Sequence, residues 1–416
     1  MDIKASKSRP NPVRATAAAS LVERETAGLS PATLLLFAVT CGLSVANVYY
    51  AQPLLDMMAA TFGIDSALIG IVITITQIGY ATGLIFIVPL GDLVDRRKLI
   101  VGQAMLSAVA LVVVGLAQNV TTLLAGMVAV GILAVVVQVL VAFTATLALP
   151  SERGRAVGLV TSGVVIGILL ARFVSGLIAD LGGWRAVYLA SALLTFVLAI
   201  LLSRVLPRRA VPVATVGYGA MLRSVPVLFL QEPLLRVRAI LALLIFAVFS
   251  TFWTALVLPL SASPLSLSHT QIGLFGLAGL AGAVAAGGAG RLADRGFAER
   301  TTGISLALLT FSWLPISALS SSLTLLIVGV VLLDLAVQAV HVTNQSLIFA
   351  IRPEARSRIV GGYMVFYSLG SALGSIASTA VYAVAGWHGV SLLGAGLSAL
   401  AFVFWMATRR ERPIER

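Results

Sequence analysis

The chain has 416 residues, of which 59% are hydrophobic and only 11% are charged. Soluble proteins average about 25% charged and about 45–50% apolar residues, so a soluble domain of this size is excluded. Twelve membrane spans of about 20 residues would use about 240 residues, which is close to the hydrophobic fraction of this chain. We therefore expect an all-α polytopic membrane protein with twelve transmembrane helices.

The charge balance is strongly basic, with 28 Lys and Arg against 16 Asp and Glu and a formal net charge of +12. A nucleic-acid-binding protein would gather its basic residues on a folded soluble face. Here they occupy short segments between apolar runs, which suits an anionic cytoplasmic membrane surface, so we expect no nucleic-acid partner. The single cysteine, Cys41, excludes an intrachain disulfide and a Cys-based metal site.

Twelve apolar runs are long enough to cross a bilayer, and helices are expected because backbone in lipid must satisfy its own hydrogen bonds. In chain order the runs are 33–56, 66–90, 99–118, 122–149, 157–180, 186–203, 239–262, 271–290, 302–320, 323–350, 361–384 and 389–407. With the N-terminus inside, all but two of the 28 Lys and Arg residues fall in cytoplasmic segments. This asymmetry predicts a multi-pass protein of the bacterial cytoplasmic membrane with both termini in the cytoplasm and no cleavable signal peptide.

The stretch 205–238, with Pro207, Pro212 and Pro226, contains no spanning run, so it divides the chain into two halves. The predicted organisation is a cytoplasmic tail at 1–30, a six-helix bundle at 31–204, a cytoplasmic central loop at 205–238, a second six-helix bundle at 239–408 and a cytoplasmic tail at 409–416. Within the loop, residues 218–230 are equally compatible with a short helix on the membrane surface and with an unstructured linker.

Several landmarks of the first half recur 203 residues later. The repeated pairs are Pro150 and Pro353, Arg153 and Arg356, Arg155 and Arg358, Gly167 and Gly370, and Gly183-Trp184 and Gly386-Trp387. Chance similarity between apolar helices accounts for one such match but not for an ordered set. Two six-helix halves related by duplication are typical of transporters whose site lies between the halves.

A charged loop motif follows the second run and recurs after the eighth. The two copies are formed by Gly91, Asp95 and Arg96 and by Gly290, Asp294 and Arg295. The first copy resembles the Gly-x-x-x-Asp-Arg-x-Gly-Arg-Arg signature of the major facilitator superfamily, although it lacks the second glycine. This resemblance covers residues 30–408 and implies the major facilitator fold, with two pseudo-symmetric six-helix bundles. It also implies a conformational latch, in which the aspartate meets the start of the eleventh helix near Gly361 when the cavity faces outward. The alternative is a charged turn that only sets topology.

Small residues recur every four positions along the fifth run and predict close helix packing. They are Gly163, Gly167, Ala171 and Ser175, with Gly176 adjacent. This ladder resembles the antiporter motif of the bacterial drug–proton antiporter-like branch of the superfamily, which implies export. Arg172 stands where that motif has a proline, and the fourth run lacks the arginine that the branch carries there. The proton-coupling role of that arginine is therefore not carried over to this chain.

Two charged residues lie deep within apolar runs. Placing Arg172 near a helix centre costs at least about 2.5–3.5 kcal/mol, so we expect it to face the interior and pair with an anionic substrate group or a carboxylate. The alternative is a side chain that extends to the outer interface. Asp334 is the only acidic residue deep within any run, and burial suits a carboxyl group that gains and loses a proton.

Asp334 belongs to a polar face of the tenth run that is about 60° wide at 100° per residue. The other members of this face are Gln338, His341 and Gln345, with Asn344 beside them. Lipid cannot solvate such a face, so we expect it to line a cavity or an interhelical network. Further candidates for the substrate or proton pathway are Asn47, Tyr50, Gln77, Gln138 and Trp253.

No nucleotide-binding loop or catalytic motif is present, so we expect neither an enzyme nor a cofactor. One histidine and one aspartate seven residues apart fall short of a zinc ligand set, so we expect no metal. The expected function is secondary active transport of a small molecule across the bilayer by a monomer working by alternating access. Proton-coupled efflux of a drug or metabolite is expected, and the alternative is proton-coupled uptake of a small polar solute such as an organic acid, sugar or amino acid.

Overall fold

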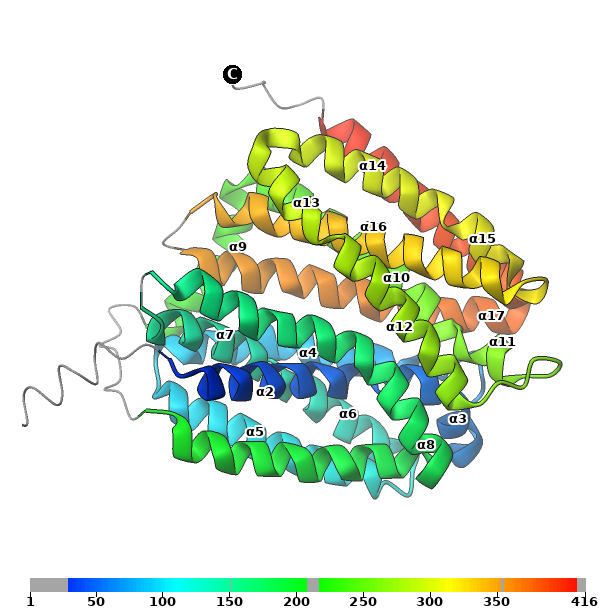
Figure 1. Cartoon of the computed structure of the whole chain (residues 1–416), viewed down its shortest axis with the longest axis horizontal. Helices are drawn as coiled ribbons and strands as arrows, with labels where there is room; N and C mark the ends of the chain where they lie inside the picture. Colours follow the sequence, from blue (N-terminus) through cyan, green and yellow to red (C-terminus); the bar gives the residue numbers. More distant parts are fainter. Residues whose placement is uncertain (1–28, 150, 208–216, 353–354, 410–416) are drawn as a thin grey trace, which may run out of the picture.

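Every regular element in the described part of the chain is a helix, as the computed structural model in Figure 1 shows. The structure describes residues 29–149, 151–207, 217–352 and 355–409, without the side chains of Ala285, Asp294 and Ser357. The helices of the first half are α2 (Pro31–Tyr49), η1 (Gln52–Leu54), α3 (Leu55–Phe62), α4 (Ile71–Phe86), η2 (Val88–Asp92), α5 (Arg96–Gly115), α6 (Val120–Ala134), α7 (Val136–Leu147) and α8 (Arg153–Val205).

The second half repeats this order after a short connecting helix. Its elements are α9 (Tyr218–Gln231), α10 (Pro233–Ala255), α11 (Val257–Ser261), α12 (His269–Ala285), α13 (Gly287–Leu292), η3 (Ala293–Phe297), α14 (Ala298–Phe311), α15 (Trp313–Ser317), η4 (Ala318–Ser320), α16 (Leu323–Phe349) and α17 (Arg356–Arg409). Several spans are broken into two pieces, and at Pro53 this follows from the missing backbone N–H of proline.

Two helices are too long to cross a bilayer only once. α8 has 53 residues and α17 has 54, which is about 80 Å of ideal helix against a hydrocarbon core of about 30 Å. Each contains one glycine with a positive φ, 77° at Gly183 and 58° at Gly386, a conformation that side chains disfavour. Each of these glycines interrupts its helix, and because α8 and α17 are bent back on themselves (Figure 1), each supplies two crossings. The ten apolar helical segments of the described chain thus account for the twelve predicted crossings.

The two halves form two helical bundles that lie side by side. Figure 1 shows the first half, in blue to green, below the second half, in yellow to red. Within the bundles α2 packs on α8 and α10 packs on α17, and between them α8 packs on α12 and α4 packs on α17. The small residues of α8 permit this close approach: a Cβ on Gly167 would lie 2.2 Å from the Gly42 carbonyl oxygen, and one on Gly176 would lie 2.1 Å from the His269 carbonyl oxygen.

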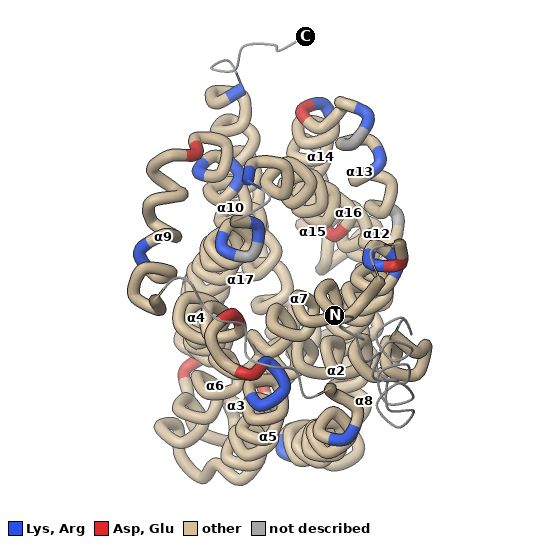
Figure 2. The backbone as a smooth tube through the Cα atoms, turned by 90° about the vertical axis from the view of Figure 1, so that its left-hand side faces the viewer, with Lys and Arg blue, Asp and Glu red and all other residues tan. Residues whose placement is uncertain are grey.

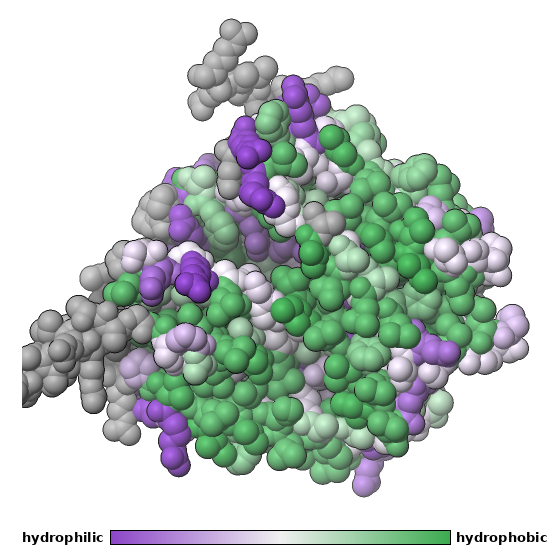
Figure 3. All heavy atoms as spheres, viewed as in Figure 1, coloured by the Kyte–Doolittle hydropathy of each residue, from purple (hydrophilic) through white to green (hydrophobic). Residues whose placement is uncertain are grey.

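The outer surface of the bundle is apolar over its middle (Figure 3). Large hydrophobic side chains point outward from many helices, including Leu193, which is 66% exposed, and Val384, which is 90% exposed. Apolar patches of this extent are unstable in water and suit contact with lipid. The protein is therefore a multi-pass membrane protein, as predicted.

The connection between the halves is more structured than the sequence indicated. Residues 218–231 form α9, a helix rather than an unstructured linker. α10 begins at Pro233, a residue suited to the first helical position. The central loop therefore ends before residue 238, and Arg238 lies inside α10 with its side chain fully buried. The prediction that Arg238 belongs to a cytoplasmic loop is wrong, because hydropathy alone cannot place a charge near the edge of a span.

Candidate functional site

A cavity of about 1140 Å³ lies between the two bundles at one end of the molecule. It is lined by η2, α7, α9, the C-terminal ends of α4 and α16, and the N-terminal starts of α5, α8 and α17. All of these segments belong to the side that the topology prediction assigns to the cytoplasm. Figure 2 views the molecule from this side, where Lys and Arg residues outnumber Asp and Glu. Of the candidate pathway residues, only Gln138 lines this cavity.

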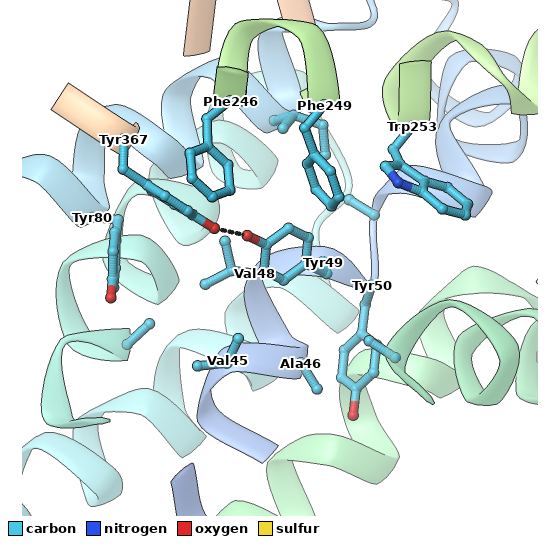
Figure 4. Packing of buried hydrophobic residues seen from close by; sticks show 14 of the residues in the cluster. Val45, Ala46, Val48, Tyr49, Tyr50, Tyr80, Phe246, Phe249, Trp253 and Tyr367 are labelled. Carbon is cyan, nitrogen blue, oxygen red and sulfur yellow. Dashed lines mark hydrogen bonds between the residues drawn. The ribbon is translucent and has the colours of Figure 1, made fainter. Parts of the chain in front are cut away.

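A layer of aromatic side chains lies where the two bundles meet (Figure 4). The hydroxyl groups of Tyr49 and Tyr367, one from each half, are hydrogen-bonded to each other. The ring of Phe246 lies 3.8 Å from that of Tyr367, measured between centroids. The amide nitrogen of Gln138 lies 3.4 Å from the hydroxyl of Tyr80, which connects the layer to the cavity wall. The hydrogen bond between Tyr49 and Tyr367 joins the two halves, while the other two contacts pack the layer within each half.

Arg172 lies in the interior of the bundle and is only 2% exposed, so its side chain does not extend to the outer interface. Its Nε donates to Oε1 of Gln52 at 3.0 Å. Its guanidinium carbon lies 3.9 Å from the ring centre of Trp253, and the rings of Phe249 and Tyr49 lie at 5.4 and 5.5 Å. Aromatic faces attract a desolvated cation. One guanidinium nitrogen, Nη2, makes no hydrogen bond within the described chain.

Asp334 lies on the other side of the same tryptophan. Trp253 donates its indole N–H to Oδ1 of Asp334 at 3.2 Å, while Oδ2 has no hydrogen-bond partner among the described residues. The carboxylate fits because Gly279 faces it: a Cβ there would lie 1.9 Å from Oδ2. Trp253 thus contacts a cation from the first half with its face and an anion from the second half with its edge. We call Arg172, Trp253 and Asp334 the central bridge.

The rest of the polar face of α16 does not join this bridge. Nδ1 of His341 lies 3.0 Å from the hydroxyl of Tyr363, and the side-chain amide of Asn344 lies 3.5 Å from it. Gln338 and Gln345 are partly buried and make no side-chain hydrogen bond within the described part of the chain. Residues on one face of a long helix meet different neighbours at different depths, so the predicted single site is divided between two layers.

A buried polar network missed by sequence reasoning adjoins His341. Arg238 donates to Thr302 at 3.2 Å and to Asn344 at 3.3 Å, and it forms an ion pair with Glu299. Glu299 also accepts the indole N–H of Trp405 at 2.9 Å. The network joins α10, α14, α16 and α17, so it stabilises the second bundle internally. The proline that begins α10 is the sequence signal that could have placed Arg238 in a helix.

The remaining pathway candidates of the first half are buried away from the cavity. Asn47 accepts a hydrogen bond from Ser191 at 2.5 Å, which ties α2 to the second crossing of α8. Tyr50 and Gln77 are buried within the first bundle. None of these three side chains lines the cavity.

The described side chains of the charged loop motif make no hydrogen bond or ion pair between the two halves in this conformation. Asp95 caps its own helix by accepting from the backbone N–H groups of Arg97 at 2.8 Å and Lys98 at 3.4 Å. Arg96 pairs with Asp92 at 2.7 Å and donates to the Gly91 carbonyl oxygen at 2.7 Å. In the second copy, Gly290 packs near Val342, Arg295 is exposed, and the side chain of Asp294 lies outside the described residues.

At the end of the bundles opposite the cavity, a histidine of the second half is held between two aspartates of the first. Nε2 of His269 lies 3.0 Å from Asp56, and Nδ1 lies 3.3 Å from Asp180. Asp180 also accepts the backbone N–H of His269 at 3.1 Å and of Thr270 at 2.8 Å, and the Thr270 hydroxyl at 2.6 Å. We call these four residues the outer clasp. Sequence reasoning missed it, although all of its members lie near ends of predicted spans on the same side.

Comparisons with known proteins agree with this architecture. The family model described as Major Facilitator Superfamily matches residues 34–258 and 238–416. The uncharacterized transporter YgaY of Escherichia coli O157:H7 is 44% identical over 377 residues, 91% of this chain and 95% of that protein. The protein named Probable transporter SCO4007, of Streptomyces coelicolor, is 32% identical over 415 residues, 97% of this chain and 93% of that protein.

A solved structure shares the fold. It is that of a bacterial homologue of the human lysosomal transporter Spinster in an inward-facing, unoccupied conformation, and it aligns with a TM-score of 0.76 at 16% identity. The alignment covers 92% of this chain and 98% of that one. With its duplicated bundles, its cavity between them and these matches, the chain belongs to the major facilitator superfamily and is a membrane transporter rather than an enzyme.

Proposed function

We propose that the protein is a proton-coupled secondary transporter of the bacterial cytoplasmic membrane, with both termini inside, and that it exports a small molecule by alternating access. The observation that carries this proposal is the central bridge, in which a buried cation and a buried carboxylate come from different bundles. A single chain supplies both bundles and the whole pathway, so we propose that it acts as a monomer.

The conformation supports an inward-open state. The large cavity lies on the predicted cytoplasmic side, whereas the aromatic layer, the central bridge and the outer clasp join the halves from mid-membrane to the opposite side. Opening the outer side requires all three sets of contacts to separate. The latch at Asp95 would then form as the cytoplasmic side closes, with the aspartate meeting the start of α17 near Gly361.

Proton coupling follows from the energetics of buried charge. Arg172 and Asp334 both contact the side chain of Trp253, which keeps their opposite charges near one another in this conformation. When the halves separate on the outer side, Asp334 loses this neighbour, and an isolated buried carboxylate is costly. Taking up a proton from outside removes that cost. Return to the inward-open state brings Arg172 back and favours release of the proton to the cytoplasm, so the protonation of Asp334 and the movement of the bundles are linked.

Export is the direction that suits this cycle. The proton moves inward as the protein changes from outward-open to inward-open. The empty, deprotonated protein is then held inward-open by its central bridge. Binding of a substrate from the cytoplasm must therefore favour the change back to the outward-open state. The apolar cavity open to the cytoplasm is suited to load a partly apolar compound, and less suited to a sugar or an amino acid.

The test begins with a growth screen of a deletion strain and an overexpressing strain against chemically varied compounds, which identifies a transported compound. In everted membrane vesicles energised by respiration, wild-type protein should accumulate that compound, and an uncoupler should abolish the accumulation. Asp334→Asn should insert normally and lose the pH-gradient dependence. Asp65→Asn, which removes an exposed carboxylate whose hydrogen bond is local to its loop, is the matched control.

Undiminished pH-gradient dependence in Asp334→Asn would exclude this residue as the coupling site. Accumulation in right-side-out vesicles instead of everted ones would replace export by uptake.

A further inference from the structure

The charged side chains that line the cavity are almost all cationic. Among the described residues, four arginines line it, against the single carboxylate of Asp92. Asp92 lies 2.7 Å from Arg96, so these two charges neutralise each other. The other three arginines, Arg153, Arg356 and Arg358, form no ion pair within the described chain. The space between the bundles is therefore electropositive.

These arginines come from both halves of the protein. Arg153 begins α8 and Arg356 begins α17, and the two positions are equivalent in the internal repeat. A basic residue on this side of the protein need not face the cavity. Arg155, two residues after Arg153 on α8, is exposed and does not line the cavity. An anion in the cavity would be attracted by both bundles at once.

The buried charges of the central bridge do not reverse this sign. Arg172 and Asp334 have opposite charges and are both nearly fully buried, so their fields largely cancel. Neither side chain lines the cavity. The potential that a cytoplasmic compound meets therefore comes from the arginines near the opening, where low-dielectric walls focus the field.

Most of the remaining cavity wall is apolar. Phe229 of α9 and Phe366 of α17 stack with their ring centroids 5.2 Å apart, and Leu84, Val139 and Val365 contribute aliphatic surface. The cavity volume of about 1140 Å³ slightly exceeds the range of about 300–1,000 Å³ found for small-molecule sites. A ligand that fits this wall has a large apolar body.

We propose that the transported compound is an amphipathic organic anion, in which a carboxylate, sulfonate or phosphate is attached to an aromatic or aliphatic body. This inference rests on the proposed function and names its substrate class. The acidic group would lie among Arg153, Arg356 and Arg358, and the apolar body would lie against Phe229 and Phe366.

A set of probes that share one ring system tests this proposal. Naphthalene-2-sulfonate, a naphthyl trimethylammonium ion and naphthalene-2-methanol supply an anion, a cation and a neutral compound. Binding to the full-length protein is measured by titration calorimetry in nanodiscs of phosphatidylcholine without a pH gradient. The anion should bind at least tenfold more tightly than the other two. Equal or tighter binding of the cation or the neutral probe would overturn the proposal.

Matched variants locate the effect. The double variant Arg153→Gln/Arg356→Gln should weaken binding of the sulfonate at least tenfold and leave the neutral probe unchanged. The control Arg155→Gln/Arg204→Gln removes the same charge from exposed positions that do not line the cavity, and it should bind the sulfonate as wild type does. An equal loss in both double variants would show a general surface effect and refute the site.

Two further arms complete the design. Nanodiscs that contain phosphatidylglycerol distinguish two sources of the anion: competition with the sulfonate supports a lipid headgroup, and unchanged binding supports a soluble compound. Binding of the sulfonate to Asp334→Asn separates this inference from the proposed function. If Asp334→Asn binds the sulfonate and still shows normal proton-driven transport, the coupling role of Asp334 is wrong but the substrate class stands. If the wild-type protein instead transports a cation in a proton-driven manner, the substrate class is wrong but the proposed function stands.

Discussion

The outer clasp makes a quantitative prediction about the balance between inward-open and outward-open states. Asp180 accepts hydrogen bonds from two backbone N–H groups at the start of α12, from the Thr270 hydroxyl and from His269. All of these partners belong to the second half, so the bonds exist only while the outer side is closed. Asp180→Asn keeps an acceptor oxygen but removes the charge that strengthens these bonds.

The structure sets the size of the effect. A side-chain cap at a helix N-terminus contributes about 1 kcal/mol, and hydrogen bonds to charged groups contribute about 1.5–3 kcal/mol when buried. The Asp180 side chain is 27% exposed, so solvent weakens its hydrogen bonds in part. Asp180→Asn should therefore destabilise the closed outer side by about 1–2 kcal/mol. That energy corresponds to a change of about 5- to 30-fold in the ratio of closed to open outer sides.

The assay measures how often the outer side opens. Ile272 is 3% exposed and lies between the bundles beside Arg172, so a cysteine in its place reacts with a membrane-impermeant maleimide from outside only after opening. In a Cys41→Ser background, which removes the native thiol, the labelling rate of Ile272→Cys follows the open population. Asp180→Asn should raise this rate about 5- to 30-fold.

The matched control is Asp65→Asn, which removes a carboxylate of an exposed loop on the same side that bonds only the backbone of Ala67. It should change the labelling rate less than about twofold, as expected for an exposed surface substitution. If Asp180→Asn labels at the wild-type rate, the clasp does not stabilise the closed outer side and the reasoning is wrong.

Three further variants test other contacts. Gly279→Ala should lower proton-driven flux in vesicles at least tenfold, because its Cβ would lie 1.9 Å from the carboxylate of the bridge, whereas Gly287→Ala has no atom within 4 Å of its Cβ and should keep the flux. Arg238→Gln should lower the thermal unfolding midpoint in detergent, since breaking its ion pair with the partly exposed Glu299 costs about 3 kcal/mol; an unchanged midpoint would contradict that role. Asp95→Asn should insert normally and abolish transport, and normal flux would exclude the latch.

The crossings of the chain follow from the sequence because hydropathy and spacing depend on local residues. The glycines at 183 and 386 were visible as a repeated Gly-Trp pair, and the structure shows that they end one crossing and begin the next. The interior position of Arg172 also follows from the cost of exposing a charge to lipid.

The partners of these residues could not be predicted, because they come from helices distant in the chain. Arg172 meets Trp253 of α10, and Asp180 meets His269 of α12. A single sequence contains the residues that line each helix but not which helices are neighbours. The position of Asp334 on a polar face of α16 was predicted. Its separation from His341 was not, because Asp334 bonds to Trp253 whereas His341 bonds to Tyr363.

The room that Gly279 leaves for Asp334 also bears on how the two halves diverged. A shift of 203 residues places Thr76 at the position of Gly279 and Gly131 at that of Asp334. A Cβ on Gly131 would lie 2.0 Å from the Thr76 carbonyl oxygen, so each half keeps one glycine at this helix crossing, but on opposite helices. Only the half with glycine on α12 has space for an acidic side chain on α16. The chain therefore carries one carboxylate at this crossing instead of a symmetric pair.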